Sequence, residues 1–117
     1  MRRTVVIVDD HARFRRSARK LLELEGFAVV GEAASGESAI EAVERLRPDL
    51  AVVDVGLPDM TGFDVSERIR GGTQVVLVSS RHPADIGRRA SSCGAVGFLT
   101  KDELTGDRLA ATLDRRA

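Results

Sequence analysis

A carboxylate follows a buried-strand pattern in the middle of this chain. The residues 50–53 are all apolar, Asp54 comes next, and Gly56 and Pro58 mark a turn directly after it. A continuous apolar run bounded by turn residues is typical of a central parallel strand covered on both faces. In open α/β sheets, ligands bind in the crevice beyond the carboxyl ends of the strands. Asp54 is therefore the first candidate functional residue, although a solvated turn aspartate would fit the same local pattern.

Three other apolar stretches also end in polar side chains. Asp9 and Asp10 follow the first, Ser79 follows a later one, and Lys101 follows the last. Taken singly, the acidic pair could cap a helix, the serine could start a turn and the lysine could be solvated. Because the carboxyl ends of parallel strands meet at one edge of a sheet, their joint occurrence favours a common site.

Such a site could bind a cation and accept phosphate. Two unit charges about 4 Å apart interact by about 1 kcal/mol in water and roughly 4 kcal/mol at an effective dielectric constant near 20, so three clustered carboxylates repel strongly. Lys101 offsets one charge and a divalent cation could offset two. Oxygen ligands without a Cys or His cluster favour Mg²⁺ over zinc. A carboxylate such as Asp54 can accept a phosphoryl group as an acyl phosphate, with Lys101 and Ser79 donating to the phosphoryl oxygens.

The elements that must position these residues alternate between strands and helices. The expected strands are Thr4–Val8, Phe27–Ala33, Leu50–Val55, Val75–Val78 and Ala95–Leu99. The expected helices run from about Phe14 to Gly26, from a cap at Ser35 to before Pro48, from Gly62 to Arg70, from Pro83 to Gly94, and from a cap at Asp102 to the end of the chain. This βαβαβαβαβα order predicts a three-layer α/β fold with a parallel sheet and right-handed crossovers, its second strand nearer an edge.

Composition excludes several classes of function. Lys+Arg and Asp+Glu both number 18, so the formal net charge is zero and a general nucleic-acid or membrane surface is not expected. Tyr and Trp are absent and Phe numbers 4, which argues against stacking platforms for single-stranded nucleic acid. The one cysteine, Cys93, suits a reducing cytoplasm and is expected in the core. No stretch approaches the roughly 20 apolar residues of a membrane span.

Four motifs together resemble one protein family. They read VVIVDDH, DVGLPDMTGFD, VVLVSS and GFLTK, in this order. The ordered set resembles the receiver domains of response regulators in two-component signalling, over essentially all 117 residues. It implies a flavodoxin-like (βα)5 fold with strand order 2-1-3-4-5. The stretches VDDHARFRRS and VVGEAASG resemble the NarL/LuxR-type subfamily.

The resemblance also implies roles for the matched positions. Asp54 would be the phosphoacceptor. Asp9 and Asp10 would form the acidic pair around Mg²⁺, with Asp10 a direct ligand, and Asp54 and the backbone carbonyl of Gly56 would complete the protein ligands.

Three further matched positions would bind or report the phosphoryl group. Ser79 resembles the switch hydroxyl and Lys101 the phosphoryl-binding lysine. Phe98, three positions before that lysine, resembles the switch aromatic, although a lone phenylalanine in a last strand also fits an ordinary core residue. The surface that changes would be formed by residues 83–115.

The chain departs from the family pattern at several positions. Proline usually follows the lysine, whereas Asp102 follows Lys101 here, and a non-proline cis bond costs roughly 2.5–4 kcal/mol, so a trans or strained bond is expected. Gly56 lacks the side chain that often projects toward the phosphoryl group, and Arg81 occupies another position that tunes acyl phosphate lifetime. We therefore expect an altered lifetime, in a direction that the sequence does not define.

The resemblance implies partners rather than an enzymatic substrate. A sensor histidine kinase would supply the phosphoryl group, and the chain would catalyse only its own phosphorylation and dephosphorylation. The output would be a downstream protein or a C-terminal DNA-binding domain absent from residues 1–117, and a homodimer is compatible with the pattern. A stand-alone receiver and a truncated longer protein both fit.

Three other classes of function compete with this hypothesis. A receiver fold that takes no phosphate could act as a constitutive protein-interaction module; Asp10, Asp54 and Lys101 argue against it, whereas Gly56 and Asp102 leave it open. A Mg²⁺ phosphohydrolase with an aspartyl nucleophile needs a second Asp two residues later, where this chain has Gly56. A nucleotide-binding domain is disfavoured because neither GxxxxGK[ST] nor GxGxxG occurs.

Overall fold

The computed structural model of the chain describes residues 2–69, 71–80 and 86–114. Its strands are β1 (Thr4–Val8), β2 (Ala28–Ala33), β3 (Leu50–Asp54), β4 (Gln74–Ser79) and β5 (Gly97–Thr100). Its helices are α1 (Ala12–Leu24), α2 (Gly36–Leu46), α3 (Gly62–Arg68), α4 (Ile86–Ser92) and α5 (Gly106–Asp114), with a 3-10 helix η1 (Lys101–Glu103) before the last. All neighbouring strands pair in parallel in the order β2-β1-β3-β4-β5, which confirms the expected flavodoxin-like fold.

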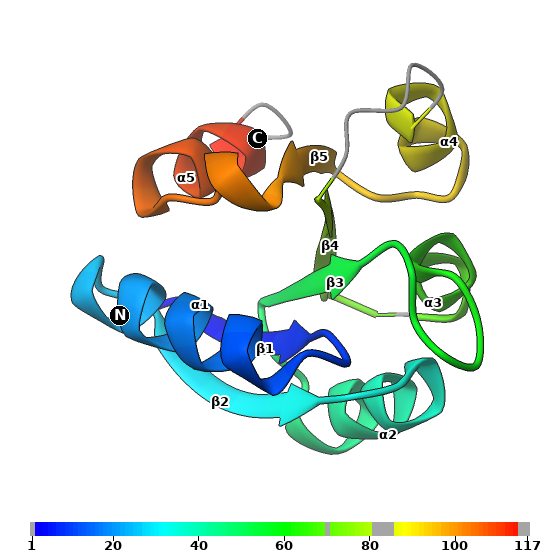
Figure 1. Cartoon of the computed structure of the whole chain (residues 1–117), viewed down its shortest axis with the longest axis horizontal. Coiled ribbons are helices and arrows are strands. Elements are labelled where there is room, and N and C mark those ends of the chain that lie inside the picture. The colour runs from blue at the N-terminus through cyan, green and yellow to red at the C-terminus, as the bar shows by residue number, and fades with distance from the viewer. Residues whose placement is uncertain (1, 70, 81–85, 115–117) are drawn as a thin grey trace.

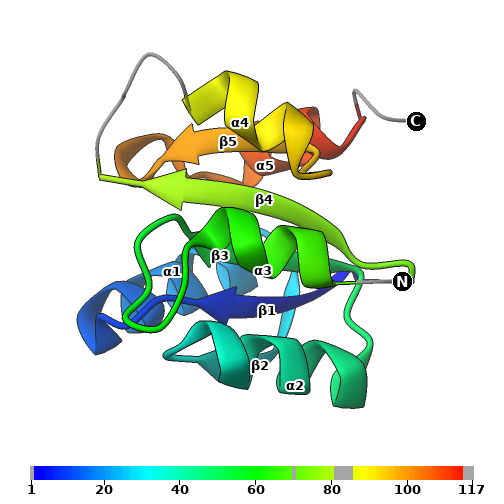
Figure 2. The same ribbon diagram turned by 90° about the vertical axis from the view of Figure 1, so that its right-hand side faces the viewer.

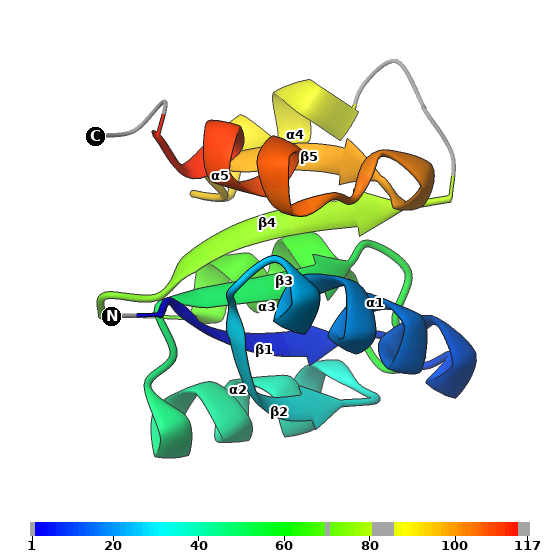
Figure 3. The same ribbon diagram turned by 90° about the vertical axis from the view of Figure 1, so that its left-hand side faces the viewer.

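The sheet is the middle of three layers. Helices α1 and α5 cover one face, and α2, α3 and α4 cover the other (Figure 1). Figure 2 shows the face under α2, α3 and α4, and Figure 3 shows the face under α1 and α5. Alternate strand residues supply the two cores: Val52 packs with the α1 and α5 side, and Val53 packs with the other. The central strand therefore needs apolar residues at every position before Asp54, which is why its sequence reads as a continuous apolar run.

The edge strand β2 differs from the central strands in its exposure. Its burial alternates along AVVGEA, whereas every residue of β3 is buried. Hydrogen bonds from β1 satisfy only one side of β2, since the sheet ends there. The prediction that the second strand lies nearer an edge is confirmed.

The ends of several helices follow from local residue types. Gly26, with φ of 95°, ends the turn after α1, and Gly94, with φ of 87°, follows α4; both are left-handed conformations that glycine adopts without strain. The Ser35 hydroxyl accepts a hydrogen bond from the Ser38 N–H and caps α2, as predicted. No helix of the described ranges is both long and apolar enough to cross a membrane.

The predicted boundaries were wrong at the end of the chain. Asp102 does not cap the last helix, because it lies in η1; the Thr105 hydroxyl instead accepts from the Arg108 N–H at 3.1 Å at the start of α5. The third helix ends at Arg68, two residues earlier than predicted. The predicted helix start at Pro83 lies outside the described residues. The Lys101–Asp102 bond is trans, in agreement with expectation.

Candidate functional site

The carboxyl ends of four strands bring the predicted polar residues to one edge of the sheet. Asp9 directly follows β1 and Asp54 is the last residue of β3. Ser79 is the last residue of β4, and Lys101 directly follows β5. Because all these strands are parallel and in register, the four positions lie at the same edge although up to 92 residues separate them in the chain.

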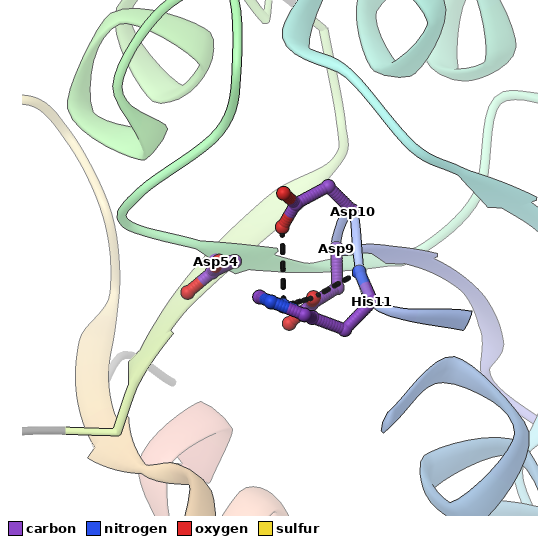
Figure 4. Close-up of side chains that lie close together, drawn as sticks. All are labelled: Asp9, Asp10, His11 and Asp54. Atoms are coloured by element: carbon purple, nitrogen blue, oxygen red, sulfur yellow. Dashed lines mark hydrogen bonds and ion pairs between the residues drawn. The ribbon is translucent and has the colours of Figure 1, made fainter. Parts of the chain in front are cut away.

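Three carboxylates and an imidazole form one cluster at this edge. Asp9, Asp10, His11 and Asp54 each offer a ligand atom, and these atoms all lie within 4.8 Å of one another. Figure 4 shows that the first three come from the loop between β1 and α1, whereas Asp54 reaches the cluster from β3. Asp9 is fully buried and Asp54 is 7% exposed, while Asp10 and His11 are exposed. The cluster is thus buried on its sheet side and open on its outer side.

His11 is part of the cluster, which the sequence did not predict. Its Nδ1 lies 3.0 Å from Asp9 Oδ1 and 3.2 Å from Asp10 Oδ1 (Figure 4). Its backbone N–H also donates to Asp9 Oδ1 at 2.8 Å. The only sequence signal was that His11 follows the acidic pair directly.

Lys101 supplies the positive charge of the site. Its Nζ lies 2.6 Å from Asp9 Oδ2 and 3.8 Å from Asp54 Oδ1. Asp9 Oδ2 is buried and has no hydrogen bond of standard geometry to the described residues, so the ammonium is its partner through the ion pair. A buried carboxylate without such a partner would be strongly destabilising. Lys101 therefore stabilises Asp9 and still lies within reach of Asp54.

The surroundings of Asp54 favour its protonated form. The pKa of its carboxyl is raised from 3.8 to about 6, mainly because burial penalises the charged form, and the Asp9 carboxylate adds to the rise. The Lys101 ammonium and the backbone N–H of Gly56 act in the opposite direction, since both stabilise the carboxylate. Asp54 is consequently a carboxylate at neutral pH, but a positive charge placed next to it would be strongly favoured.

The loop between β3 and α3 is held by backbone contacts around Gly56. Gly56 pairs with Thr61 in an isolated antiparallel bridge, and the Gly62 N–H donates to the Val55 carbonyl at 2.8 Å. A Cβ on Gly62 would lie 2.5 Å from the Asp54 carbonyl oxygen, so only glycine allows α3 to begin this close to the end of β3. These contacts hold the Gly56 backbone beside the cluster.

The β3–α3 loop is also attached to the start of α2. The Asp59 carboxylate accepts hydrogen bonds from the backbone N–H groups of Gly36 at 2.8 Å and Glu37 at 3.0 Å. These bonds lower the pKa of Asp59 because they stabilise its charged form. The sequence suggested no role for Asp59, since its partners lie more than twenty residues away in the chain.

The remaining predicted residues lie in β4, β5 and the segment between them. Ser79 is partly buried at the end of β4. Phe98 lies in β5 opposite Leu77 and packs partly buried against the core under α2, α3 and α4. Arg81 lies outside the described residues.

The donor set of the cluster fits a hard divalent cation. Asp9, Asp10 and Asp54 bring three carboxylates together and Lys101 adds one ammonium, so the formal charge of the group is minus two. Carboxylate oxygens open to solvent on one side suit Mg²⁺, which retains several waters when bound. The residues present are therefore compatible with Mg²⁺.

The chain is similar to a large set of known proteins. The family model described as "Response regulator receiver domain" matches residues 5–114. A putative transcriptional regulator of Pseudomonas aeruginosa is 37% identical over 110 residues, which are 92% of this chain and 53% of that protein. The nitrate/nitrite response regulator protein NarL of Escherichia coli is 36% identical over 113 residues, 92% of this chain and 52% of that protein. The chain thus spans about half the length of the curated relatives it matches.

Solved structures of related response regulators have the same fold as this chain. The signal receiver domain of the putative response regulator NarL from Mycobacterium tuberculosis superimposes with a TM-score of 0.88 at 36% identity, covering 97% of this chain and 94% of that chain. A LuxR-family two-component response regulator from Aurantimonas superimposes with a TM-score of 0.87 at 28% identity, covering 98% of this chain and 84% of that chain. With a matching family model over nearly its whole length and NarL/LuxR-type homologues, the chain belongs to the response regulator receiver domain family of two-component signalling.

Proposed function

We propose that this chain is a phosphorylation-switched receiver that accepts a phosphoryl group on Asp54. The observation that carries the proposal is the position of Asp54, which ends the central strand within a cluster formed by Asp9, Asp10 and Lys101. The phosphoryl donor is a sensor histidine kinase, the cation is Mg²⁺, and the site lies in the cytoplasm. Residues 1–117 act as one receiver domain.

Asp54 is the nucleophile in the proposed transfer. A carboxylate oxygen of Asp54 forms a bond to phosphorus while the bond from phosphorus to the donor histidine nitrogen breaks, and the electron pair of that bond leaves with the imidazole. Asp54 needs no base, because its pKa of about 6 leaves it ionised at neutral pH. The chain catalyses only its own phosphorylation and dephosphorylation in this proposal.

Four groups of the chain would hold Mg²⁺. These are the carboxylates of Asp9, Asp10 and Asp54 and the backbone carbonyl of Gly56, with Asp10 the exposed direct ligand. When bound, Mg²⁺ supplies charge neutralisation for the phosphoryl oxygens during the transfer. The His11 imidazole, whose Nδ1 lies 3.2 Å from Asp10 Oδ1, would compete with the cation for the Asp10 carboxylate.

Lys101 and Ser79 would bind the transferred group, and Phe98 would report it. The phosphoryl group adds about −1.5 to −2 charges and new acceptor oxygens, which the Lys101 ammonium and the Ser79 hydroxyl can satisfy. Phe98 then turns inward behind Ser79, and the surface of residues 83–115 changes. To shift the populations of the resting and switched conformations from 1:99 to 99:1, the phosphoryl group must favour the switched conformation by roughly 5.5 kcal/mol. Gly56 and Arg81 tune the acyl phosphate lifetime.

The output partner is inferred from the relatives. Their names describe transcriptional and response regulators about twice the length of this chain. We infer that the switched surface acts on a DNA-binding segment or a downstream protein, or pairs with a second receiver. With a formal net charge of zero, the receiver itself does not bind nucleic acid.

The decisive experiment measures intact mass after incubation with Mg²⁺ and a small acyl phosphate donor. The parent should gain one phosphoryl group, and Asp54→Ala should gain none. Asp107→Ala, which removes an exposed carboxylate of α5, is the matched control and should behave like the parent.

A folded parent that gains no phosphoryl group with Mg²⁺ present would refute the proposal. It would favour the alternative in which the receiver fold binds its partner without phosphorylation. Amide exchange over residues 86–114, with and without beryllofluoride as a phosphoryl mimic, tests the switch separately: an unchanged pattern would remove that part of the proposal.

A further inference from the structure

The ammonium group of Lys101 has an aromatic neighbour that the proposed chemistry does not use. Its Nζ lies 4.4 Å from the centroid of the Phe14 ring. A cation within about 6 Å of a ring face is attracted by the quadrupole of the ring. Phe14 lies in the first turn of α1 and is partly buried against the core under that helix. The core therefore holds the ring in place, and the lysine side chain is the mobile partner of the contact.

The ammonium is placed unequally between the two carboxylates of the site. It lies 2.6 Å from Asp9 Oδ2 but 3.8 Å from Asp54 Oδ1. Charge-assisted contacts to carboxylates span about 2.7–2.9 Å, so the ammonium pairs closely with Asp9 and only loosely with Asp54. The Lys101 side chain is 18% exposed, so that water competes little with either contact. Asp9 and Phe14 together define one position of the ammonium, set back from the proposed phosphoacceptor.

We propose that Phe14 is a positioning residue for Lys101, whose ring face holds the ammonium in a resting position beside Asp9. The inference rests on the proposed function of Asp54. A phosphoryl group on Asp54 draws the ammonium toward its oxygens and away from the ring. The contact with Phe14 stabilises only the resting position and therefore opposes the phosphorylated state. Phe14 sets how readily Lys101 responds to phosphorylation, although it would contact neither the phosphoryl group nor Mg²⁺.

The lysine content of the chain allows a direct spectroscopic test. The sequence contains two lysines, Lys20 and Lys101, and Lys20 is exposed on α1. Protein labelled with ¹³C-lysine should give two ε-methylene signals, with Lys20 as the internal reference. The ring current of Phe14 should move the Lys101 signal upfield. Phe14→Leu should abolish that displacement and leave Lys20 unchanged, whereas Phe14→Tyr, which keeps a ring face, should retain it.

A binding measurement tests the consequence for the switch. The probe is beryllofluoride with excess Mg²⁺, titrated into the parent, Phe14→Leu and Phe14→Tyr. Because the lost contact favours only the resting position, Phe14→Leu should bind the probe about twofold to tenfold more tightly. Phe14→Tyr should remain close to the parent. A merely structural role of Phe14 would weaken binding in both variants or change neither.

The outcomes separate this inference from the proposed function. A parent that binds no beryllofluoride would refute the proposed function and this inference with it. If the parent binds beryllofluoride but Phe14→Leu binds it equally or more weakly, the role of Phe14 alone is overturned. The same conclusion follows if Phe14→Leu leaves the Lys101 signal of the parent unchanged. Thermal melting verifies that each variant is folded, and Phe14→Met replaces Phe14→Leu if the latter lacks a native transition.

Discussion

Asp54 is the residue at which burial and charge conflict most directly. It ends a strand in which every residue is buried, yet the proposed transfer requires its carboxylate to be available to an incoming group. Its pKa of about 6 expresses that conflict, since burial and the Asp9 charge outweigh Lys101 and the Gly56 N–H. Such perturbed carboxyls are typical of functional sites, where a charge is held without full compensation.

The raised pKa of Asp54 predicts how replacing it changes stability with pH. The folded protein binds the proton more tightly than the unfolded chain, so this stabilising contribution is fully present below about pH 3.8 and is lost as the pH rises through about 6. Asp54→Asn removes the charge, and without divalent cations it should raise the free energy of unfolding at pH 8 by up to about 3 kcal/mol. At pH 4 the difference should nearly vanish. Urea denaturation at both pH values, with a chelator present, measures it.

Asp64 provides a control of opposite sign for this measurement. Its pKa is lowered chiefly by the hydrogen bond that it accepts from the Thr61 N–H. Its charged form therefore stabilises the fold above its ordinary pKa, and Asp64→Ala should lower stability at pH 8. A destabilised Asp54→Asn variant at pH 8 would contradict the proposed electrostatics of the site.

At the scale of elements, the start of α3 is limited by its distance from β3. Alanine is normally the better helix former, by about 1 kcal/mol over glycine. At position 62, however, an added Cβ would lie 2.5 Å from the Asp54 carbonyl oxygen and 3.0 Å from Val55 Cα, both backbone atoms. The gain in helix propensity from alanine should therefore be smaller than the free-energy cost of moving α3 away from β3.

Gly62→Ala should accordingly destabilise the protein by roughly 1–3 kcal/mol, the usual cost of overpacking. Gly72→Ala is the matched control, because a Cβ there would meet no atom within 4 Å. Urea denaturation of both variants tests this expectation. Equal stability of the two variants would mean that α3 can shift without cost.

The second element-scale feature is the link between the β3–α3 loop and α2. Asp59 accepts from the first two backbone N–H groups of α2, which have no partners within the helix. Asp59→Ala should therefore lower the urea midpoint more than Glu41→Ala, which removes an exposed charge from α2 itself. If both variants lose the same amount, the loop is not held by this cap.

At the scale of the whole molecule, the sheet carries the candidate site at the edge where the carboxyl ends of its parallel strands meet. Two apolar cores hold the strands on both faces, so that the polar residues gather where the strands end. The proposed switch would involve β4, β5 and η1, which carry Ser79, Phe98 and Lys101. Binding at this edge should consequently stabilise the fold as a unit.

Ligand-linked stabilisation gives a prediction for the whole chain. Mg²⁺ with beryllofluoride at about 100 times its dissociation constant should stabilise the native state by about 2.7 kcal/mol. For a domain of this size such a change raises the melting temperature by several degrees, measurable by calorimetry. Asp54→Ala should show no beryllofluoride-dependent increase. A parent whose melting temperature is unchanged would indicate that the site does not bind the mimic.

Much of the fold and part of the site could be predicted from the sequence. The alternation of apolar runs with helical periodicity predicted all five strands, and Gly26, Ser35 and Gly94 predicted helix ends, because these signals act over a few residues. Boundaries near Asp102 were wrong because η1 replaced the expected helix start. That the predicted acids and the lysine share one edge followed from the parallel direction of the strands, since their carboxyl ends meet at one edge.

By itself the sequence determined the parallel sheet and the residue types at the strand ends, since hydrophobic periodicity and turn residues are local properties. The order of the strands was implied only by the resemblance of the motifs to receiver domains. Only the tertiary structure decided which side chains meet. It put the Phe14 ring under the Lys101 ammonium, His11 beside the acidic pair and Asp59 at the start of α2. These contacts join residues whose spacing carries no signal, because they depend on how whole elements pack and on the direction in which each side chain leaves its backbone.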